Sequence, residues 1–501
     1  MRWKPQKSNL LLCLILGVSA AVPRFWHLTQ LGLTHFDEGS YTMAGKWLAT
    51  LGKEGWFFQA GQAPGLFPTL VGLFFWLFGI QDYVAISVSA LAGTLTAGLL
   101  FALGREWFGR KVGVLAALFL ATCEYHLIYS RMALTDALFT LLFWAALALL
   151  FHGVRNQSRL GFILGGVVTG LCWNTKYHGF FPLLIVGLWL LGTALDQWRK
   201  RGGGFVASLQ PRRFGLAVSL AVLTYLPWFL SVVFTVGYGS VLRGQLNHSL
   251  GSGRLILTPP AALYFYLTHW LSPILLFFAL VGFVRALIDR SAAALFLMVI
   301  FGFFAGSALL YLSFPRLILP LVPAVCLFGA CGIVFLSRKT RWIDPGIALT
   351  ACALAVVVWN LAGARGMLTL KTDSYRQAAA YLQSFNEPLL TELNKNFYFY
   401  EREKKSKELR WQTLEELDRL IHDSPSILIA VDPILRRLPE RYAWFERLWP
   451  RLTLLRSFPL RIYKPAYFQG FDPNQGFENA TGPVTPYVPG KARIDVYRLQ
   501  N

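Results

Sequence analysis

Two adjacent carboxylates, Asp37 and Glu38, follow directly after the first long apolar run of the sequence. An ionisable side chain at the border of lipid is costly, and it is therefore a functional candidate by default. Thr34 precedes Asp37 by three residues, which is the spacing of a capping box, and an apolar face follows along residues 41–51. This pattern predicts a helix on the membrane surface with the acids at its N-terminus. Asp37 then either caps this helix or accepts a proton from a substrate hydroxyl as a general base.

A third acid also lies at the start of an expected helix, next to an apolar run. Asp136 lies at the start of an expected helix in YSRMALTDALF, residues 129–139. The basic residues that also border apolar runs are Arg131, Lys176, His178 and Arg316. A single Lys or Arg at such a place can simply extend its charge to the headgroups. A set of them suits a lipid phosphate, because a phosphate accepts charge-assisted hydrogen bonds at headgroup depth.

The composition indicates what kind of protein must position these side chains. Of the 501 residues, 55% are hydrophobic and only 15% are charged, whereas about a quarter of the residues of a soluble protein are charged. The mean hydropathy is +0.47, and apolar runs long enough to span a membrane recur up to about residue 361. The predicted fold class is therefore mainly α, a polytopic helical membrane protein.

The formal net charge of +21 does not indicate a nucleic-acid partner. The basic residues are spread over short loops between apolar runs, whereas nucleic-acid binding needs one basic patch. All six cysteines lie within apolar runs, and no metal-ligand spacing occurs. We expect neither a metal nor a cofactor.

About eleven membrane spans are expected. They are residues 9–26, 83–104, 112–130, 136–152, 160–174, 178–195, 214–236, 262–285, 292–312, 316–336 and 345–361. Lys and Arg concentrate in cytoplasmic loops. The basic loops all share the side of the N-terminus if the apolar segment 64–79 enters the membrane without crossing it. We therefore expect a cytoplasmic N-terminus, a re-entrant or juxtamembrane helix at 64–79, and the acids and basic residues named above on the outer face.

The composition changes after residue 361. The expected domains are a transmembrane catalytic domain over residues 1–361 and an extracytoplasmic soluble α/β domain over residues 362–501. Within the second domain, residues 372–385 and 413–424 have the pattern of amphipathic helices, and residues 426–433, 451–458 and 492–499 have that of strands.

The acids and cations together fit the transfer of a sugar from a polyprenyl phosphate. Arg and Lys would bind the phosphate and stabilise it as it leaves. A carboxylate would take the proton from an acceptor hydroxyl as that hydroxyl attacks the anomeric carbon, with inversion. Asp37 is the preferred base and Glu38 the alternative, because neighbouring residues on a helix point in different directions. Asp136 would orient the acceptor or a cationic partner.

Four segments give the sequence a resemblance to a known family. They are FDEGSYTMAG (36–45), QAPGLFPTLVGLFFWLFG (62–79), SRMALTDAL (130–138) and FPRLILPLVPA (314–324). In this order and spacing, the sequence resembles the GT-C glycosyltransferases that use polyprenyl-phosphate sugars, namely protein O-mannosyltransferases and lipid A aminoarabinose transferases. The resemblance covers the membrane part, about 360 residues.

This resemblance implies roles for individual residues. Asp37 matches the first-loop Asp that acts as the catalytic base, and Asp136 matches the second-loop Asp. Lys176 and Arg316 match groups near the donor phosphate. One departure is that the aminoarabinose transferases have Lys-Pro-Pro where this sequence has Gln62-Ala63-Pro64. The departure argues against that subgroup, and it leaves open whether Arg131, Lys176 or Arg316 replaces the missing lysine.

A long Gly- and Ser-rich loop, residues 237–260, carries Arg243, His248 and Arg254. We expect it to be either a lid that orders over bound substrate or a flexible connector.

The main alternative is a lipid or sugar transporter or flippase without transferase activity. Such a protein places charged or helix-breaking residues near mid-membrane in paired halves, whereas the candidates here gather at one face. A non-catalytic scaffold is a third option. The expected partners are a polyprenyl-phosphate sugar donor, a lipid, glycan or protein acceptor, and membrane lipid, in a bacterial plasma membrane. The identities of the sugar and the acceptor stay open.

Overall fold

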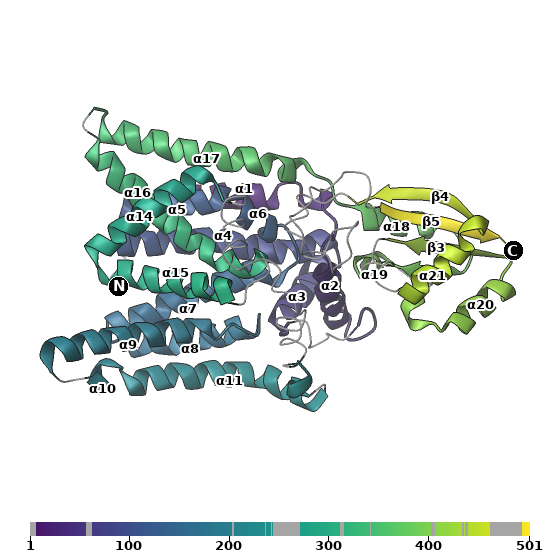
Figure 1. Cartoon of the computed structure of the whole chain (residues 1–501), viewed down its shortest axis with the longest axis horizontal. Helices are drawn as coiled ribbons and strands as arrows, with labels where there is room; N and C mark the ends of the chain where they lie inside the picture. Colours follow the sequence, from purple (N-terminus) through teal and green to yellow (C-terminus); the bar gives the residue numbers. More distant parts are fainter. Residues whose placement is uncertain are drawn as a thin grey trace. The chain divides into compact units, whose positions relative to one another are not determined.

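The structure is a computed structural model, and most of its described residues are helical (Figure 1). It describes residues 7–56, 63–202, 205–235, 237–241, 243, 271–310, 315–340, 342–393, 395–401, 406–432, 435, 439–460 and 493–500. The chain divides into two compact units. Unit 1 comprises residues 1–26, 59–70 and 86–368, and unit 2 comprises residues 27–58, 71–85 and 369–501.

Unit 1 is a bundle of helices. Its helices, three of which (α3, α4 and α17) extend into unit 2, are α1 (Lys7–Phe25), α3 (Leu66–Phe78), α4 (Asp82–Phe108), α5 (Arg110–Thr122), α6 (Glu124–Ser130), α7 (Thr135–Arg155), α8 (Arg159–Trp173), α9 (Phe181–Arg201), α10 (Phe205–Ser208), α11 (Pro211–Thr235), α14 (Pro273–Asp289), α15 (Ala292–Leu310), η2 (Pro315–Leu321), α16 (Val322–Lys339) and α17 (Pro345–Thr369).

Within the described residues, seven helices are long and apolar enough to cross a membrane, or eight if the bent pair α5–α6 is one span. The predicted polytopic helical class is confirmed. Two of the eleven expected spans form shorter apolar helices, α8 and α15, and the expected span at 262–285 lies partly outside the described residues. Helix α3 has 13 residues, or about 20 Å. This length is below the roughly 30 Å of a hydrocarbon core and agrees with a segment that does not cross.

Glycines let the helices of unit 1 approach one another closely. A Cβ atom on Gly282 of α14 would lie 1.9 Å from the carbonyl oxygen of Phe328, and one on Gly332 of α16 would lie 2.0 Å from that of Phe278. Only glycine therefore fits at this crossing. Small residues at contacts are how helices associate in lipid, where burial of apolar surface provides no driving force.

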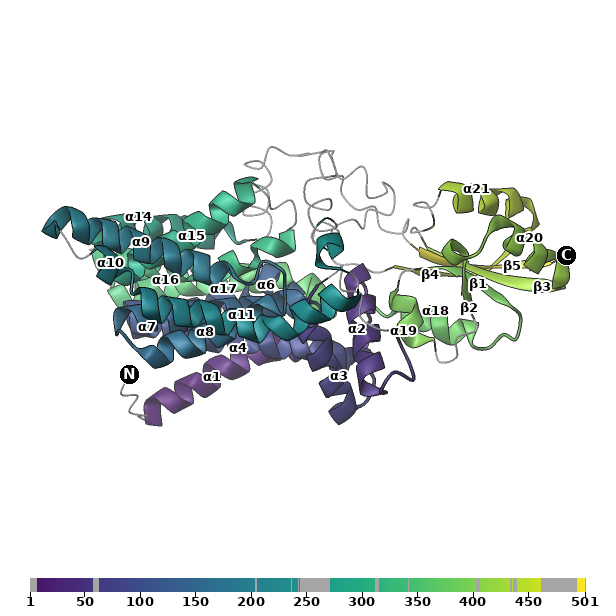
Figure 2. The same ribbon diagram turned by 90° about the horizontal axis from the view of Figure 1, so that it is seen from below.

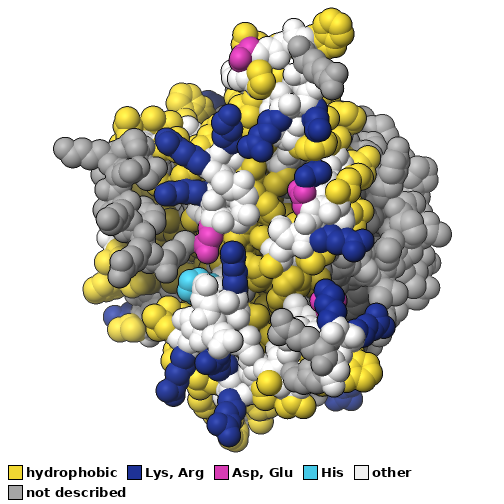
Figure 3. All heavy atoms as spheres, turned by 90° about the vertical axis from the view of Figure 1, so that its left-hand side faces the viewer, with side chains coloured by type: hydrophobic (Ala, Val, Ile, Leu, Met, Phe, Trp, Pro, Cys, Tyr) yellow, Lys and Arg dark blue, Asp and Glu magenta, His cyan; other side chains and the backbone are white. Residues whose placement is uncertain are grey.

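The basic loops of unit 1 end at a common face. Figure 3 shows Lys and Arg side chains gathered on the face that carries the helix ends. Exposed basic residues at these helix ends include Lys111, Arg155, Lys200, Arg212 and Lys339. This one-sided distribution is the observation on which the predicted membrane orientation depends.

Unit 2 contains a five-stranded sheet in the order β2-β1-β3-β5-β4. Its elements are η1 (Leu28–Gln30), α2 (Phe36–Ala49), α18 (Ser374–Leu382), β1 (Leu389–Glu392), α19 (Asn396–Tyr400), β2 (Ser406–Glu408), η3 (Leu409–Trp411), α20 (Leu414–Asp423), β3 (Ser426–Val431), α21 (Pro439–Leu448), η5 (Trp449–Arg451), β4 (Leu452–Pro459) and β5 (Arg493–Gln500). Strand β1 pairs in parallel with β2 and β3, whereas β5 pairs antiparallel with β3 and β4.

Helices cover both faces of this sheet, with α20 and α21 on one side and α18 and α19 on the other (Figure 2). The core on the first side joins apolar residues of β1, β3 and β5 to Leu417, Ile421 and Trp444 of the covering helices. Helix α20 begins at a capping box formed by Thr413 and Glu416. The predicted α/β character, with helices near 372–385 and 413–424 and three strands, is confirmed.

Compact unit 2 includes more than the C-terminal domain, because it also takes in residues 27–58 and 71–85. Helix α17 continues to Thr369, past the expected boundary at residue 361. The described part of helix α2 is largely buried within this unit. Its Gly45 lies against Val71 and its Gly39 against Lys395 and Asn396 of the sheet domain. The prediction of a helix at this position is correct, but its buried face packs on protein.

Candidate active site

The acid pair lies at the first turn of α2, and Glu38 closes the helix start. The Oε2 atom of Glu38 accepts hydrogen bonds from the backbone N–H groups of Thr34 and His35, each at 2.7 Å, and from the Thr34 hydroxyl at 3.2 Å. His35 is the N-cap, and its Nδ1 accepts from the backbone N–H of Asp37 at 3.1 Å. The expected capping pair Thr34–Asp37 is therefore wrong. The cap is His35 with Glu38, because a capping acid sits three residues after the N-cap.

The two acids consequently have different surroundings. Glu38 is only 1% exposed, and its carboxylate is committed to the chain that enters the helix. Asp37 is half-buried, and its carboxylate lies outside this capping box. The Asp37 carboxylate is thus not part of the helix cap, and its role as a general base stays a prediction.

In unit 1, the structure brings Asp136 and Lys176 together. Asp136 lies in the first turn of α7, and Lys176 lies in the loop between α8 and α9. The Lys176 Nζ is 2.5 Å from the Asp136 Oδ1, and both residues are more than nine-tenths buried. The Asp136 Oδ2 is buried and has no hydrogen-bond partner among the described residues. A buried ion pair contributes little net stability, since desolvation offsets the attraction between the two charges. Stability alone therefore does not explain why this pair is present.

His178 and Arg316 belong to the same neighbourhood. The His178 ring lies 4.8 Å from that of Phe139, and the Lys176 Nζ lies 5.5 Å from the Phe139 ring. Burial, together with the positive charges of Lys176 and Arg316, lowers the pKa of His178 to about 3. The imidazole is therefore neutral near pH 7, where it can donate one hydrogen bond but carries no charge.

Arg316 lies on η2, a segment held to α7 by a hydrogen bond from the Trp144 Nε1 to the Pro320 carbonyl at 2.8 Å. Helix α7 begins at the turn that carries Asp136. One helix thus positions both the buried acid and the segment with Arg316. Four of the predicted site residues, Asp136, Lys176, His178 and Arg316, come from three separate parts of the sequence to this region of unit 1.

Arg131 has a different set of contacts from the one predicted. Its side chain is 4% exposed, and its Nη1 donates to the carbonyl oxygens of Pro23, Arg24 and Trp26 at 2.7–3.3 Å. These carbonyls end α1, where unpaired acceptors and the negative end of the helix dipole favour a cation. Its contacts are thus those of a helix cap, and binding of the donor phosphate by Arg131 stays a prediction.

Of the three candidate residues in the predicted substrate loop, the structure describes one, Arg243. Arg243 is exposed and donates from Nε to the Gly239 carbonyl at 3.3 Å. His248 and Arg254 lie outside the described residues. No group of three His, Cys, Asp or Glu side chains with metal-site geometry occurs within the described ranges. The expectation that no metal is involved stays a prediction.

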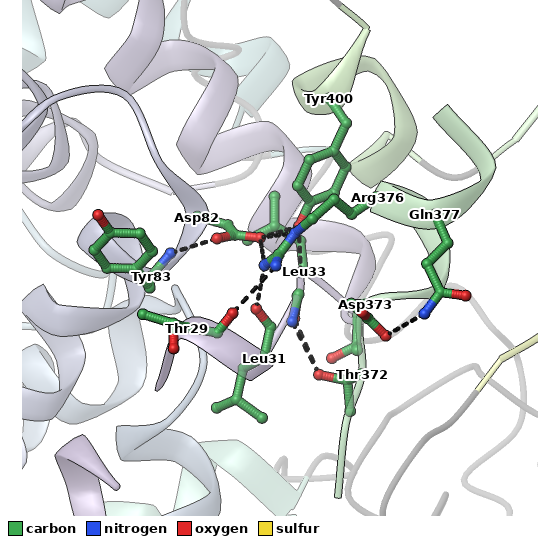
Figure 4. Close-up of polar contacts among 12 residues, drawn as sticks. Thr29, Leu31, Leu33, Asp82, Tyr83, Thr372, Asp373, Arg376, Gln377 and Tyr400 are labelled. Carbon is green, nitrogen blue, oxygen red and sulfur yellow. Dashed lines mark hydrogen bonds and ion pairs between the residues drawn. The ribbon is translucent and has the colours of Figure 1, made fainter. Parts of the chain in front are cut away.

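Two clusters of charged residues escaped the sequence analysis. Asp82, at the start of α4, binds Arg376 and Tyr400 in unit 2 (Figure 4). In unit 1, the fully buried Arg24 donates to the carbonyls of Leu120 and Ala121, the last turn of α5, where the chain bends by 61° into α6. Both Asp82 and Arg24 border or interrupt an apolar run. The signal that selected Asp37 and Asp136 could have found them.

Comparison with known proteins finds one family model that matches part of the chain and solved structures that share its fold. A family model described as dolichyl-phosphate-mannose-protein mannosyltransferase matches residues 62–210, the segment that includes Asp136, Lys176 and His178. No curated protein matches the sequence. Among solved structures, ArnT from Cupriavidus metallidurans bound to undecaprenyl phosphate is similar with a TM-score of 0.61 and 14% identity, covering 97% of each chain.

A second similar structure is the archaeal oligosaccharyltransferase AglB from Archaeoglobus fulgidus, in complex with an inhibitory peptide and a dolichol-phosphate. Its TM-score is 0.56 at 11% identity, over 92% of this chain and 77% of that one. At such identities the likeness concerns the fold. The predicted resemblance to GT-C glycosyltransferases is thereby confirmed in the fold and, over residues 62–210, in the family match.

Proposed function

We propose that this protein is an integral membrane glycosyltransferase. It moves a hexosyl or pentosyl group from a polyprenyl-phosphate donor to a hydroxyl or phosphate of a lipid, glycan or protein acceptor on the outer face of the membrane. The observation that carries the proposal is the buried Lys176–Asp136 pair with His178 and Arg316 nearby. Asp136, Lys176 and His178 lie inside the segment that matches the mannosyltransferase family model.

The donor phosphate is assigned to the cations of unit 1. Lys176 and Arg316 supply positive charge, which stabilises a phosphate as negative charge builds up on it during bond cleavage. His178 stays neutral and contributes a single hydrogen bond. The Asp136 Oδ2 lacks a partner among the described residues. It would accept a hydrogen bond from a substrate hydroxyl and so remove the cost of an unsatisfied buried acceptor.

The proton is assigned to Asp37 of unit 2. An acceptor hydroxyl is a weak nucleophile, and its proton leaves as the bond to the anomeric carbon forms. The carboxylate of Asp37 is half-buried, and Glu38 fixes the helix start that carries it. Attack on the face opposite the phosphate inverts the anomeric configuration. The resemblance to ArnT, which was solved with undecaprenyl phosphate, supports this donor class.

The test is release of polyprenyl phosphate by the purified protein from a panel of polyprenyl-phosphate sugars, with lipid, glycan and peptide acceptors. We expect release that requires both an acceptor and one sugar of the panel. Arg316→Gln should weaken donor affinity about ten- to a hundredfold, since a hydrogen bond to a charged group is worth about 1.5–3 kcal/mol. Arg338→Gln, at the exposed end of α16, is the matched control.

Two results would overturn the proposal. One is a protein in vesicles that moves the lipid-linked sugar across the bilayer and never releases polyprenyl phosphate, which is the behaviour of a flippase. The other is release that proceeds equally well in Arg316→Gln and in Lys176→Met at limiting donor, with both variants folded as judged by thermal unfolding.

A further inference from the structure

A buried acid joins three segments of unit 2 that are far apart in the sequence (Figure 4). Asp82 is 3% exposed, and its Oδ2 accepts from the Arg376 guanidinium, with Nε at 3.1 Å, and from the Tyr400 hydroxyl at 2.6 Å. Its Oδ1 accepts from the backbone N–H of Tyr83 at 2.7 Å. Arg376 lies on α18 and Tyr400 ends α19, so both partners come from the C-terminal domain. We name Asp82, Arg376 and Tyr400 the latch.

The latch also holds the backbone of the first loop. Arg376 donates to the carbonyl oxygens of Thr29 and Leu31 at 3.1 and 2.6 Å. The Tyr400 hydroxyl accepts from the N–H of Leu33 at 2.9 Å. Beside it, the Thr372 hydroxyl lies 3.1 Å from the Gly32 nitrogen and 3.3 Å from its carbonyl oxygen. Four consecutive or nearly consecutive loop residues are thus bound by side chains of the C-terminal domain.

The bound stretch leads directly into the acid-bearing helix. Thr34 and His35, the next two residues, donate to Glu38 and set the start of α2. One turn further along, Gly39 packs backbone to backbone on α19, where a Cβ would lie 2.4 Å from the Lys395 carbonyl carbon. The position of Asp37 is therefore bracketed by two contacts with the C-terminal domain. One comes before it at residues 29–33, and the other comes after it at Gly39.

The chemistry of the latch makes it a stiff connection. Burial and the charge of Asp82 raise the pKa of the Tyr400 phenol well above its ordinary value, so the hydroxyl keeps its proton and donates. A carboxylate with a guanidinium and two further donors is fully compensated. Removing one partner leaves an uncompensated buried charge. This costs far more stability than breaking an exposed ion pair. The loop cannot shift without breaking charge-assisted hydrogen bonds.

We propose that Asp82, Arg376 and Tyr400 are positioning residues for the transfer reaction. Through residues 29–33 they hold the carboxylate of Asp37 at the place where the acceptor proton is taken. The C-terminal domain is then part of the catalytic apparatus, in addition to any role in binding an acceptor. This inference rests on the proposed function, in which Asp37 is the base.

The test compares two latch variants with two matched controls in the same domain. Arg376→Met and Tyr400→Phe break the latch. Arg441→Met removes another partly buried arginine, which donates to the carbonyls of Leu409 and Gln412. Tyr375→Phe removes a tyrosine hydroxyl that donates to buried Asp432 at 2.9 Å. The controls therefore lose the same kinds of bonds without contacting the first loop through them.

Two quantities are measured on each full-length protein. The first is amide hydrogen exchange at residues 32–39, with strand β3 as the reference for an intact sheet. The second is kcat and the donor KM. In both latch variants we expect faster exchange at 32–39, unchanged exchange in β3, and a kcat lowered about ten- to a hundredfold with the donor KM changed less than about threefold. A misplacement of about 1 Å can cost this much. Both controls should leave kcat and exchange at 32–39 near wild type.

Each outcome decides something. Unchanged exchange at 32–39 in Tyr400→Phe, which removes only one oxygen atom, means that the latch does not hold the loop. Faster exchange with normal kcat means that the loop is held but that its position does not matter for transfer. Either result overturns the inference. A wild-type protein that releases no polyprenyl phosphate from any donor refutes the proposed function instead, and the exchange measurement distinguishes the two failures.

Discussion

Asp37 and Glu38 are neighbours in the sequence with different tasks in the fold. The Glu38 carboxylate accepts three hydrogen bonds from Thr34 and His35, whereas Asp37 is half-buried and lies outside the cap. A capping acid is fixed by the bonds that it accepts, and it cannot take up a substrate proton without losing them. The division supports Asp37 as the base in the proposed reaction.

The first prediction separates these two roles. Asp37→Asn should fold with near wild-type stability and transfer sugar at least about a hundredfold more slowly, because general-base catalysis contributes about 10²–10⁴-fold. Glu38→Gln should instead lower the free energy of unfolding by roughly 1.5–3 kcal/mol, the value of hydrogen bonds to a buried charge. Turnover and thermal unfolding are measured on both, with Asp423→Asn as an exposed control. A dead Glu38→Gln of normal stability beside an active Asp37→Asn would reverse the assignment.

The second prediction concerns the neutral His178. Its pKa in the fold is about 3, and in the unfolded chain it is about 6.5. The unfolded state therefore takes up a proton as the pH falls below about 6.5, while the folded state does not until near pH 3. The associated stability is fully present above pH 6.5 and is lost progressively on acidification.

Thermal unfolding in detergent checks this. Between pH 7 and pH 5 the wild-type midpoint should fall more than that of His178→Gln, which has no titrating group at this position. Parallel curves for the two proteins would show that the pKa of His178 is the same in the folded and the unfolded chain, which would contradict the lowered pKa.

At the scale of elements, the contact between α2 and α19 requires a residue without a side chain at one position of α2. Gly39 lies in α2, and a Cβ there would lie 2.4–2.8 Å from backbone atoms of Lys395 and Asn396. Backbone atoms cannot rotate away as the end of a flexible side chain can. The two elements would have to separate.

The third prediction is that Gly39→Ala destabilises the protein by about 1–3 kcal/mol, as overpacking does, and also lowers turnover. Alanine improves helix propensity by up to about 1 kcal/mol over glycine, so the clash outweighs the local gain. Gly192→Ala on α9, where no atom lies within 4 Å of the added carbon, gains only the propensity term. Equal midpoints for Gly39→Ala and wild type would show that α2 and α19 are not tightly packed.

At the scale of the molecule, the basic face of unit 1 predicts the orientation in the membrane. The exposed Lys and Arg residues at the helix ends gather on one face (Figure 3), and such residues remain on the cytoplasmic side. The loop that follows α2 and the C-terminal domain are expected on the other side.

The fourth prediction tests this with an impermeant thiol reagent on intact cells, in a background without the six native cysteines. Lys53→Cys and Asp423→Cys, both exposed, should react from outside. Arg159→Cys and Lys200→Cys should react only after the cells are permeabilised. Labelling of Lys53→Cys and Lys200→Cys from the same side would refute the orientation and the outer-face reaction with it.

The sequence by itself determined the features that depend on local pattern. Apolar runs predict the helical membrane class, because a span needs an unbroken apolar stretch. A short apolar run in residues 426–433 and the pattern of residues 492–499 predict strands that the structure contains as β3 and β5. Carboxylates next to apolar runs select Asp37 and Asp136, since an acid in such a place is costly wherever the chain folds.

The tertiary structure decided which charges meet. Asp82 and Arg376 are separated by 294 positions, and Asp136 and Lys176 by 40. No periodicity encodes such a pairing, because it depends on how distant segments pack. Packing also decided that Glu38 is more deeply buried than Asp37, although the two differ by one position. A step of one residue turns a side chain by about 100° around a helix, and only the neighbouring elements determine which of the two directions is covered.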